Sequence, residues 1–278
     1  MTVTAHAPKN AAGKTSAPIL VSERSGPVSI LTLNRPQQRN SLSEALIAAL
    51  ANELAAIARD RKVRAVVITA NGPAFCAGHD LKEFTAARAA PDHGRATFER
   101  VMNDCAAMMQ AIVALPQPVI AAVNGVATAA GCQLVASCDL AVASSKARFA
   151  TPGVDIGLFC STPMVALTRN VPRKQAMEML LTGEPVDATT ALGLGLVNRV
   201  VAPGTERDAA IALAQKIALK SAYTVKLGKQ AFYRQAEMNL ADAYRYAAEV
   251  MTENMMARDA EEGIGAFIEK RTPKWQDK

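Results

Sequence analysis

The chain has 278 residues and a formal net charge of +6, and half of its residues are hydrophobic while only 4% are aromatic. This length allows one large domain, or one domain with an appendage, and the composition is that of a globular protein with an aliphatic core. Nucleic-acid binding is not expected, because no basic stripe is interleaved with aromatic residues; a mildly basic surface, or a ligand with several phosphates, accounts for the charge.

The N-terminal part of the chain predicts a lead, a hairpin and a helix. Residues 1–18 are small and polar without periodicity, so we expect a disordered lead. The runs 19–23 and 28–34 flank a Ser-Gly-Pro sequence, which predicts two strands joined by a turn. Ser41 and Glu44 have the spacing of a capping box, and apolar residues recur at helical spacing after them, which predicts a helix that begins there.

A first glycine turn follows a buried strand. The apolar run 63–70 predicts the strand, and FCAGHDLKEF at 75–84 comes directly after it. Asp80 suits the N-cap of the next helix, and Gly78 frees the backbone so that the N–H of His79 can point inward. This turn therefore offers one backbone N–H to a ligand.

A second glycine turn lies in NGVATAAGCQLVASCD, residues 124–139, after the strand predicted by PVIAAVNG. A helix that begins near Ala130 leaves its first N–H groups without intrahelical partners, and they point outward with the positive end of the helix dipole. A carbonyl oxygen that becomes an oxyanion fits such a position. The alternative is a close crossing of two packed elements, for which small residues are also suited.

Several kinds of site are not expected. The uncharged run 111–138 is interrupted by prolines, glycines and polar residues, so a buried strand and helix explain it better than a membrane span. The five cysteines are odd in number and follow no secretory signal, which indicates free thiols in the cytoplasm, or in the mitochondrial matrix in a eukaryote. With three histidines and no zinc-type spacing, we expect no metal and no permanently bound cofactor.

Beyond Pro203 the chain reads as helical. Apolar residues recur at helical spacing in 206–220, 222–235, 240–257 and 260–270. These helices carry more apolar surface than a small appendage can bury by itself. They pack either on the core or on another chain, and the residues alone leave both alternatives open.

Two sequences, CAGHDLKE and VNGVATAAGCQLVASCD, resemble the crotonase (enoyl-CoA hydratase/isomerase) family, and the similarity extends from about Ile19 along nearly the whole chain. GHDLKE, AAGCQLVASCD, FATPGVDIGLFCSTP and VPRKQAMEMLLTGEP are most similar to its enoyl-CoA hydratase domain-containing protein 3 group. The resemblance implies an α/β fold: a ββα spiral core at 19–203 that binds acyl-CoA, and a helical region at 204–278 that covers the site and assembles homotrimers or dimers of trimers.

The same resemblance implies a site for an acyl-CoA thioester, as substrate or ligand. The backbone N–H groups of His79 and Ala130 would form an oxyanion hole for its carbonyl. Residues expected to contact the CoA part, in the order of the chain, are His79, Asp80, Leu81, Lys82, Phe267 and Lys270.

The chain departs from the family at the two glutamates that manage water and the α-proton in the hydratases. Gln133 and Gly153 stand at these positions, and neither transfers a proton. Asp155 is a candidate substitute base if the segment is extended, because its side chain would then face the same way as position 153; a loop cap is the alternative. Ser161 suits a helix N-cap, and Cys160 a buried apolar position.

Three hypotheses follow. The first is an enzyme, a lyase or isomerase, that acts on acyl-CoA with an acid or base other than the two glutamates. The second is a non-catalytic acyl-CoA binder or regulator, and the third is an RNA-binding relative. We favour the first as a broad class, with little crotonyl-CoA hydration expected; acyl chain length and reaction direction are left open.

Overall fold

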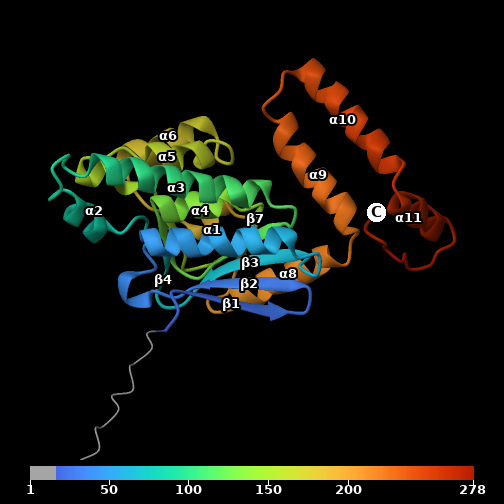
Figure 1. Cartoon of the computed structure of the whole chain (residues 1–278), viewed down its shortest axis with the longest axis horizontal. Coiled ribbons are helices and arrows are strands. Elements are labelled where there is room, and N and C mark those ends of the chain that lie inside the picture. Colours follow the sequence, from blue (N-terminus) through green and yellow to red (C-terminus); the bar gives the residue numbers. More distant parts are fainter. Residues whose placement is uncertain (1–16) are drawn as a thin grey trace, which may run out of the picture.

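The computed structural model describes residues 17–278, which form two β-sheets, eleven α-helices and two short 3₁₀ helices (Figure 1). Of the predicted disordered lead, residues 1–16 lie outside the described residues. The sheets and the helices packed on them form the body of the molecule, and a helical arm extends from it at the C-terminal end of the chain (Figure 1).

The larger sheet has the strand order β1-β2-β3-β5-β7-β10. All neighbours in it are parallel except β1 and β2, which form the predicted hairpin around Gly26 and Pro27. Its strands are β1 (Leu20–Ser25), β2 (Val28–Leu33), β3 (Ala65–Ala70), β5 (Val119–Val123), β7 (Leu140–Ser144) and β10 (Arg199–Val201).

The smaller sheet has the order β4-β6-β8-β9, with β8 and β9 antiparallel and the other pairs parallel. Its strands are β4 (Ala74–Cys76), β6 (Val126–Thr128), β8 (Arg148–Ala150) and β9 (Val186–Asp187).

The two sheets show the ββα repeat that the sequence predicted. In each of the pairs β3 and β4, β5 and β6, and β7 and β8, the first strand lies in the larger sheet and the second in the smaller one, and a helix follows. The repeat is uneven in length, because β3 begins at Ala65, β5 at Val119 and β7 at Leu140. The long helix inserted after β4 causes the difference.

Helices cover both faces of the larger sheet. Alternate residues of β5 point to opposite faces of the sheet. Val119, Ala121 and Val123 belong to the main core. Ile120 and Ala122 pack with helix α8 on the opposite face. The helices that pack in the body are α1 (Glu44–Arg59), α2 (Leu81–Ala87), α3 (Arg95–Ala114), α4 (Ala130–Ser137), α5 (Ser161–Leu167), α6 (Arg173–Thr182), α7 (Ala188–Gly193) and α8 (Glu206–Ala218).

Two details of the predicted helices are corrected. The N-cap of α1 is Ser43, whose side chain accepts a hydrogen bond from the N–H of Leu46, so the capping box from Ser41 to Glu44 is not formed. Ser41 instead lies in an extended segment that pairs with the first glycine turn. In addition, α8 covers the sheet, so the chain after Pro203 contributes one helix to the core before the arm begins.

The arm consists of α9 (Ala222–Gln235), α10 (Leu240–Met255) and α11 (Arg258–Ile268). It is anchored by Lys229, whose Nζ donates to Asp139 Oδ2 at 2.7 Å and to the carbonyl oxygens of Ile112 and Gln117. Tyr233 donates to the other oxygen of Asp139 at 2.9 Å. Because Lys229 is 9% exposed and its ammonium group has three acceptors, α9 is fixed against the body by a satisfied buried charge.

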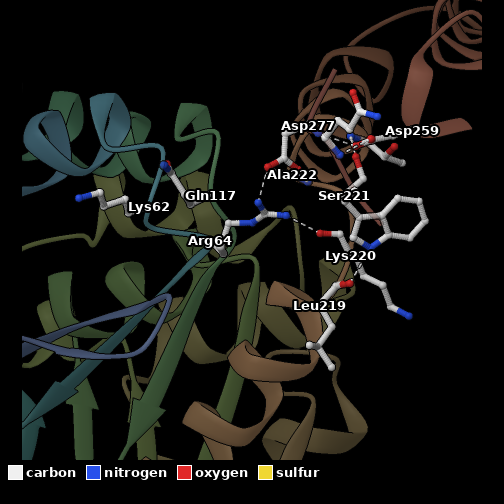
Figure 2. A network of polar contacts seen from close by, with 12 residues as sticks. Lys62, Arg64, Gln117, Leu219, Lys220, Ser221, Ala222, Asp259 and Asp277 are labelled. Carbon is white, nitrogen blue, oxygen red and sulfur yellow. Dashed lines mark hydrogen bonds and ion pairs between the residues drawn. The ribbon is translucent and has the colours of Figure 1, made fainter. Parts of the chain in front are cut away.

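The last residues of the chain fold back onto the junction between α8 and α9, as Figure 2 shows. Arg64, which precedes β3, pairs with Asp277 Oδ2 at 2.5 Å and donates to the carbonyl oxygen of Lys220 at 2.6 Å. Asp277 also accepts the N–H of Ala222 at 2.8 Å, and the indole of Trp275 donates to the carbonyl oxygen of Leu219 at 2.8 Å. The tail therefore ties the junction between α8 and α9 to the residue before β3.

The arm exposes a large apolar surface within the single chain. None of the residues of α10 is buried, although its sequence is amphipathic. The exposed large apolar residues between Leu219 and Ile268 are Leu219, Phe232, Leu240, Tyr244, Met251, Met255, Met256, Ile264, Phe267 and Ile268.

Substitution of Arg64 tests the tail contact. We expect Arg64→Met to lower the free energy of unfolding by about 2 kcal/mol, because it removes charge-assisted hydrogen bonds to Asp277 and to the Lys220 carbonyl. Trp275 is the single tryptophan, so its emission should also shift to longer wavelength as the tail loosens. Urea unfolding followed by tryptophan fluorescence measures both the free energy of unfolding and the emission wavelength.

The matched control is Arg245→Met, which removes the same side chain from an ion pair with Asp242 in which the arginine is 69% exposed. A loss of less than about 0.5 kcal/mol is expected there. Equal losses in the two variants would show that the tail network contributes no more than a surface pair.

Candidate functional site

The two glycine turns predicted from the sequence lie in contact with each other. Gly78 has a φ of +88°, and a Cβ placed on it would lie 3.0 Å from the Cβ of Ala129 and 3.2 Å from the carbonyl oxygen of Thr128. Both the backbone conformation of Gly78 and the nearby second turn exclude a side chain at this position. The close approach brings the backbone N–H of Ala130 beside the first turn.

The first turn is held along its outer edge by the segment before α1. The N–H of Leu42 donates to the carbonyl oxygen of Gly78 at 2.7 Å, and the N–H of Asp80 donates to the carbonyl oxygen of Leu42 at 3.2 Å. In such a parallel bridge the residue between the two bonds directs its own N–H and C=O the other way. The N–H of His79 therefore points away from Leu42.

A largely buried ion pair, which sequence reasoning missed, fixes the same turn. Arg35 Nη2 lies 2.9 Å from Asp80 Oδ2, with 16% and 10% of the two side chains exposed. Arg35 also donates to the carbonyl oxygen of Ser41 at 2.6 Å, so it joins the turn to the neighbouring segment. Asp80 is the N-cap of α2, as predicted, and accepts the N–H of Lys82.

The second turn contains an unusual backbone conformation. Ala129 has φ 51° and ψ −120°, a region that L-residues other than glycine rarely occupy, and its N–H donates to the carbonyl oxygen of Ala150 at 2.9 Å. Gly131 follows, and a Cβ there would collide with the carbonyl oxygen of Cys76. These constraints set the direction of the first N–H groups of α4.

Two backbone donors result from this arrangement. Within residues 17–278, neither the N–H of His79 nor that of Ala130 donates a hydrogen bond. Both groups belong to turns that touch each other, and α4 is buried at each of its eight positions. Two unpaired N–H groups in adjoining turns, with a helix N-terminus behind one of them, are the kind of donors that stabilise a negatively charged oxygen when they face the same point.

The imidazole of His79 is a neutral neighbour of this site rather than a charged one. Both ring nitrogens are buried without a hydrogen-bond partner in the described residues, and the ring lies 5.4 Å from that of Phe84 on α2. Burial lowers the pKa of His79 below 6.5, so the ring is neutral at pH 7. Because this imidazole carries no charge, the local electrostatic field comes from the backbone N–H donors.

Gln133 lies one helical turn after Ala130 on α4, on the same face of the helix. Its residue surface is 5% exposed, and its Oε1 is buried without a partner. The side-chain amide makes no hydrogen bond with any residue of the described chain, although the backbone N–H of Gln133 donates to the carbonyl oxygen of Ala129.

Gly153, which the resemblance placed at the second glutamate position, is not beside open space. It lies in a 3₁₀ helix, Pro152–Ile156, and a Cβ there would lie 2.9 Å from the carbonyl oxygen of Leu158 and 3.0 Å from Cys160 Sγ. Cys160 is 7% exposed, and burial raises the pKa of its thiol. Burial likewise raises the pKa of the Cys132 thiol to about 12, so both thiols are protonated and are poor nucleophiles at pH 7.

Two side-chain roles considered in the sequence do not match the geometry. The segment that carries Asp155 is a 3₁₀ helix and not an extended strand, and the exposed carboxylate faces Gly183 at the end of α6. The condition under which Asp155 would share the side of position 153 is therefore not met. Ser161 does not cap α5: Cys160 occupies the N-cap position, and the Ser161 hydroxyl donates to the carbonyl oxygen of Phe159 at 3.3 Å.

The residues expected to contact CoA do not come together in one chain. Leu81 is 51% exposed on α2, and Lys82 beside it is also exposed. Phe267 is 85% exposed on α11, and Lys270 follows that helix. Helices α2 and α11 lie near opposite ends of the molecule's longest axis (Figure 1).

Other features add no ligand site to this picture. A groove of about 370 Å³ between α1 and α3 is lined mainly by apolar residues and includes none of the predicted site residues. No three metal-binding side chains are grouped in residues 17–278. Across the same residues, every helix is too short or too polar to cross a bilayer.

Comparison with known proteins shows the family of the chain. The family model for enoyl-CoA hydratase/isomerase matches residues 23–278. The chain belongs to the enoyl-CoA hydratase/isomerase family. The resemblance carried by the two glycine-turn sequences is thereby confirmed, and so is the crotonase-type α/β fold with its C-terminal helical region.

Relatives in this family are similar over nearly the whole chain. Enoyl-CoA hydratase domain-containing protein 3, mitochondrial, of Xenopus laevis is 50% identical over 258 residues, which cover 93% of this chain and 86% of the relative. The human protein of the same name is 47% identical over 245 residues, which cover 88% of this chain and 79% of the relative.

Solved structures of the family agree with the fold. An enoyl-CoA hydratase of Mycobacterium smegmatis has a TM-score of 0.89 at 55% identity, with 93% of this chain and 99% of that chain covered. The human enoyl-CoA hydratase domain-containing protein 3 has a TM-score of 0.88 at 44% identity, with 93% and 100% covered.

The ion pair between Arg35 and Asp80 can be tested through stability. We expect Arg35→Met to lower the free energy of unfolding by about 3 kcal/mol, because Asp80 would remain largely buried without its cation. Arg24→Met, which removes an arginine that is 45% exposed in its pair with Asp60, serves as the control and should cost less than about 1 kcal/mol.

The free energy of unfolding lost in Arg35→Met should become smaller as the pH falls. Burial opposes ionisation of Asp80, but hydrogen bonds from Arg35 and from the Lys82 N–H outweigh it and lower the pKa of the carboxyl below 3.8. The contribution is therefore complete above about pH 4 and declines as pH falls through the lowered folded-state pKa. Denaturation midpoints at pH 3 and pH 7 that show the same difference between variant and natural protein would contradict this linkage.

The conformation of Ala129 gives a second test. We expect Ala129→Gly to raise the free energy of unfolding by about 1 kcal/mol, because relief of the strained φ and ψ exceeds the added chain entropy of glycine. Ala107→Gly, at an exposed position of α3, should lower it by about 1 kcal/mol. Thermal unfolding that shows the same sign for both variants would remove the strain argument.

Proposed function

We propose that the protein binds an acyl-CoA thioester with the carbonyl oxygen between the backbone N–H groups of His79 and Ala130. The observation that carries the proposal is the contact between the two glycine turns, each with one unpaired N–H. A thioester carbonyl becomes an oxyanion or enolate oxygen when its carbonyl carbon or α-carbon reacts, and fixed N–H donors bind that charge more strongly than the ground state.

The proposed site offers no strong acid or base for proton transfer. An oxyanion-hole donor is worth roughly 10²- to 10³-fold in rate, but it supplies no proton. Gln133 and Gly153 stand where the family hydratases have glutamates, and the thiols of Cys132 and Cys160 are protonated. Burial lowers the pKa of His79, which makes its neutral ring a weaker base than a free imidazole. Since general acid and base groups contribute roughly 10²- to 10⁴-fold each, the natural protein should hydrate crotonyl-CoA very slowly.

The same observations support a second candidate, a non-catalytic acyl-CoA binder or regulator. Tight binding without turnover across enoyl-, dienoyl- and 3-hydroxyacyl-CoA, followed by mass spectrometry of the products, would favour the binder. Turnover of any member of the panel would favour an enzyme, a lyase or isomerase with a different acid or base. Failure to bind any acyl-CoA at millimolar concentration in calorimetry would remove both.

The proposed site for CoA requires more than one copy of the chain. The separation of α2 from α11 in one chain means that Lys82 can share a CoA with Phe267 and Lys270 only if these come from another copy. A homotrimer or dimer of trimers, with the exposed apolar surface of the arm at its contacts, would provide this.

The five free, buried cysteines fit a reducing compartment, the cytoplasm or the mitochondrial matrix.

Restoring the carboxylates tests the account of the slow hydration. We expect kcat/KM of the natural protein on crotonyl-CoA below about 10⁴ M⁻¹ s⁻¹, well under the values of efficient enzymes. Gln133→Glu with Gly153→Glu should raise it more than either change alone, because the two groups act as a unit. A natural value of about 10⁶ M⁻¹ s⁻¹ or above would show that another residue transfers the proton.

The contacts of Gly153 call for a steric control. Any side chain there displaces the Leu158 carbonyl or the Cys160 thiol, so Gly153→Glu disturbs the loop as well as adding a carboxylate. Gln133→Glu with Gly153→Ala introduces the same Cβ without the carboxylate. The difference in kcat/KM between the two double variants isolates the contribution of the second carboxylate.

A further inference from the structure

The two ends of the unit that contains the second turn are joined at one carboxylate. This unit runs from β5 through β6 to α4, and Asp139 lies between α4 and β7. Oδ2 of Asp139 accepts the backbone N–H of Val119, the first residue of β5, at 2.6 Å. The carboxylate therefore ties the C-terminal end of α4 to the start of β5, while the N–H of Ala130 lies at the opposite end of the helix.

The arm supplies the other partners of this carboxylate. Lys229 on α9 donates to Oδ2 of Asp139 at 2.7 Å, and Tyr233, one turn later on the same helix, donates to Oδ1 at 2.9 Å. Only 6% of the Lys229 side chain and 15% of the Asp139 side chain are exposed. Charge-assisted hydrogen bonds that are shielded from water are stronger than those between exposed groups. Asp139 is therefore fixed to the arm as well as to β5.

Helix α4 is a short and closely packed element. Its eight residues span about 12 Å, and each of them is buried. Because packed interiors deform little, a displacement at one end of such a helix is carried to the other end. A change in the position of Asp139 therefore reaches Ala130.

The residue before α4 is held in a strained conformation. Ala129 has φ 51° and ψ −120°, and such a conformation persists only where surrounding contacts fix it. On the N-terminal side its N–H donates to the carbonyl oxygen of Ala150 at 2.9 Å, and on the C-terminal side the restraint is Asp139. If that restraint were loosened, relaxation of Ala129 would turn the N–H of Ala130. A donor displaced by about 1 Å loses much of its effect on a reacting carbonyl.

We infer that Lys229 and Tyr233 are positioning residues for the proposed oxyanion site. Through Asp139 they hold α4 along its axis, and α4 in turn sets the direction of the Ala130 N–H. The carbonyl of a bound thioester is then fully polarised only while α9 is attached to the body of the molecule. The inference rests on the proposed acyl-CoA function and adds to it two residues of the arm.

A chromophoric thioester, 4-dimethylaminocinnamoyl-CoA, tests the inference. Its absorption moves to longer wavelength as hydrogen bonds polarise the thioester carbonyl, so the wavelength of the bound maximum reports the donors and not the amount of complex. Titration of the natural protein to saturation should give such a shift. Tyr233→Phe removes one bond to Asp139 and should lose about half of the shift, and Lys229→Met should lose most of it.

Two other residues of α9 supply matched controls. The hydroxyl of Tyr223 donates to Glu253 Oε1 at 3.1 Å, within the arm, and Lys226 is exposed. Tyr223→Phe and Lys226→Met make the same chemical changes on the same helix away from Asp139, so both should keep the natural shift. A purely structural role of Lys229 and Tyr233 would lower the folded fraction, and with it the amount of bound ligand, without moving the bound maximum.

The outcomes separate the inference from the function on which it rests. If the natural protein shows the shift and both Tyr233→Phe and Lys229→Met retain all of it, positioning by the arm is wrong while the acyl-CoA site stands. Equal losses in these variants and in their controls would also overturn it, because any change in α9 would then disturb the site. If Lys229→Met is insoluble, Tyr233→Phe decides alone. If the natural protein binds the thioester without a shift, or does not bind it, the oxyanion site fails and the inference fails with it.

Discussion

The site depends on one close contact, between Gly78 in the first turn and residues 128–130 in the second. A Cβ at position 78 would come within 3.0 Å of the Ala129 side chain, and the φ of +88° disfavours one in any case. Both turns end strands of the smaller sheet, β4 and β6, which are parallel neighbours. Sheet pairing therefore brings together the turns that carry the N–H groups of His79 and Ala130, which are 51 residues apart in the chain.

Each turn is then held in place by contacts on its other side. Arg35, Asp80 and the Leu42 bridge fix the outer edge of the first turn, while the Ala150 carbonyl accepts the N–H of strained Ala129 in the second. The strain at Ala129 and the unsatisfied amide of Gln133 both lower stability close to the same point. A large aliphatic core, which buries α4 completely, offsets such local losses.

The sequence predicted the elements that depend on local patterns. The hairpin at Gly26, the cap at Asp80 and the start of α4 at Ala130 follow from turn chemistry, capping and periodicity, and the structure has all three. The roles of Ser41, Ser161 and Asp155 depended on the path of irregular segments, and there the structure differs. Arg35 could not be placed at Asp80, because 45 residues separate them and no local pattern encodes that pairing.

The contacts of Gly153 change the meaning of its substitution. Taken as a sequence, a glycine in place of a glutamate suggests open space where a carboxylate is missing. In the structure the Leu158 carbonyl and the Cys160 thiol fill that side. The side of Gly153 is therefore filled by the fold, whereas the Oε1 of Gln133 remains buried and unpaired. The two positions differ in what they offer: Gly153 has no room for a side chain, while Gln133 presents a hydrogen-bonding group on the same face of α4 as Ala130.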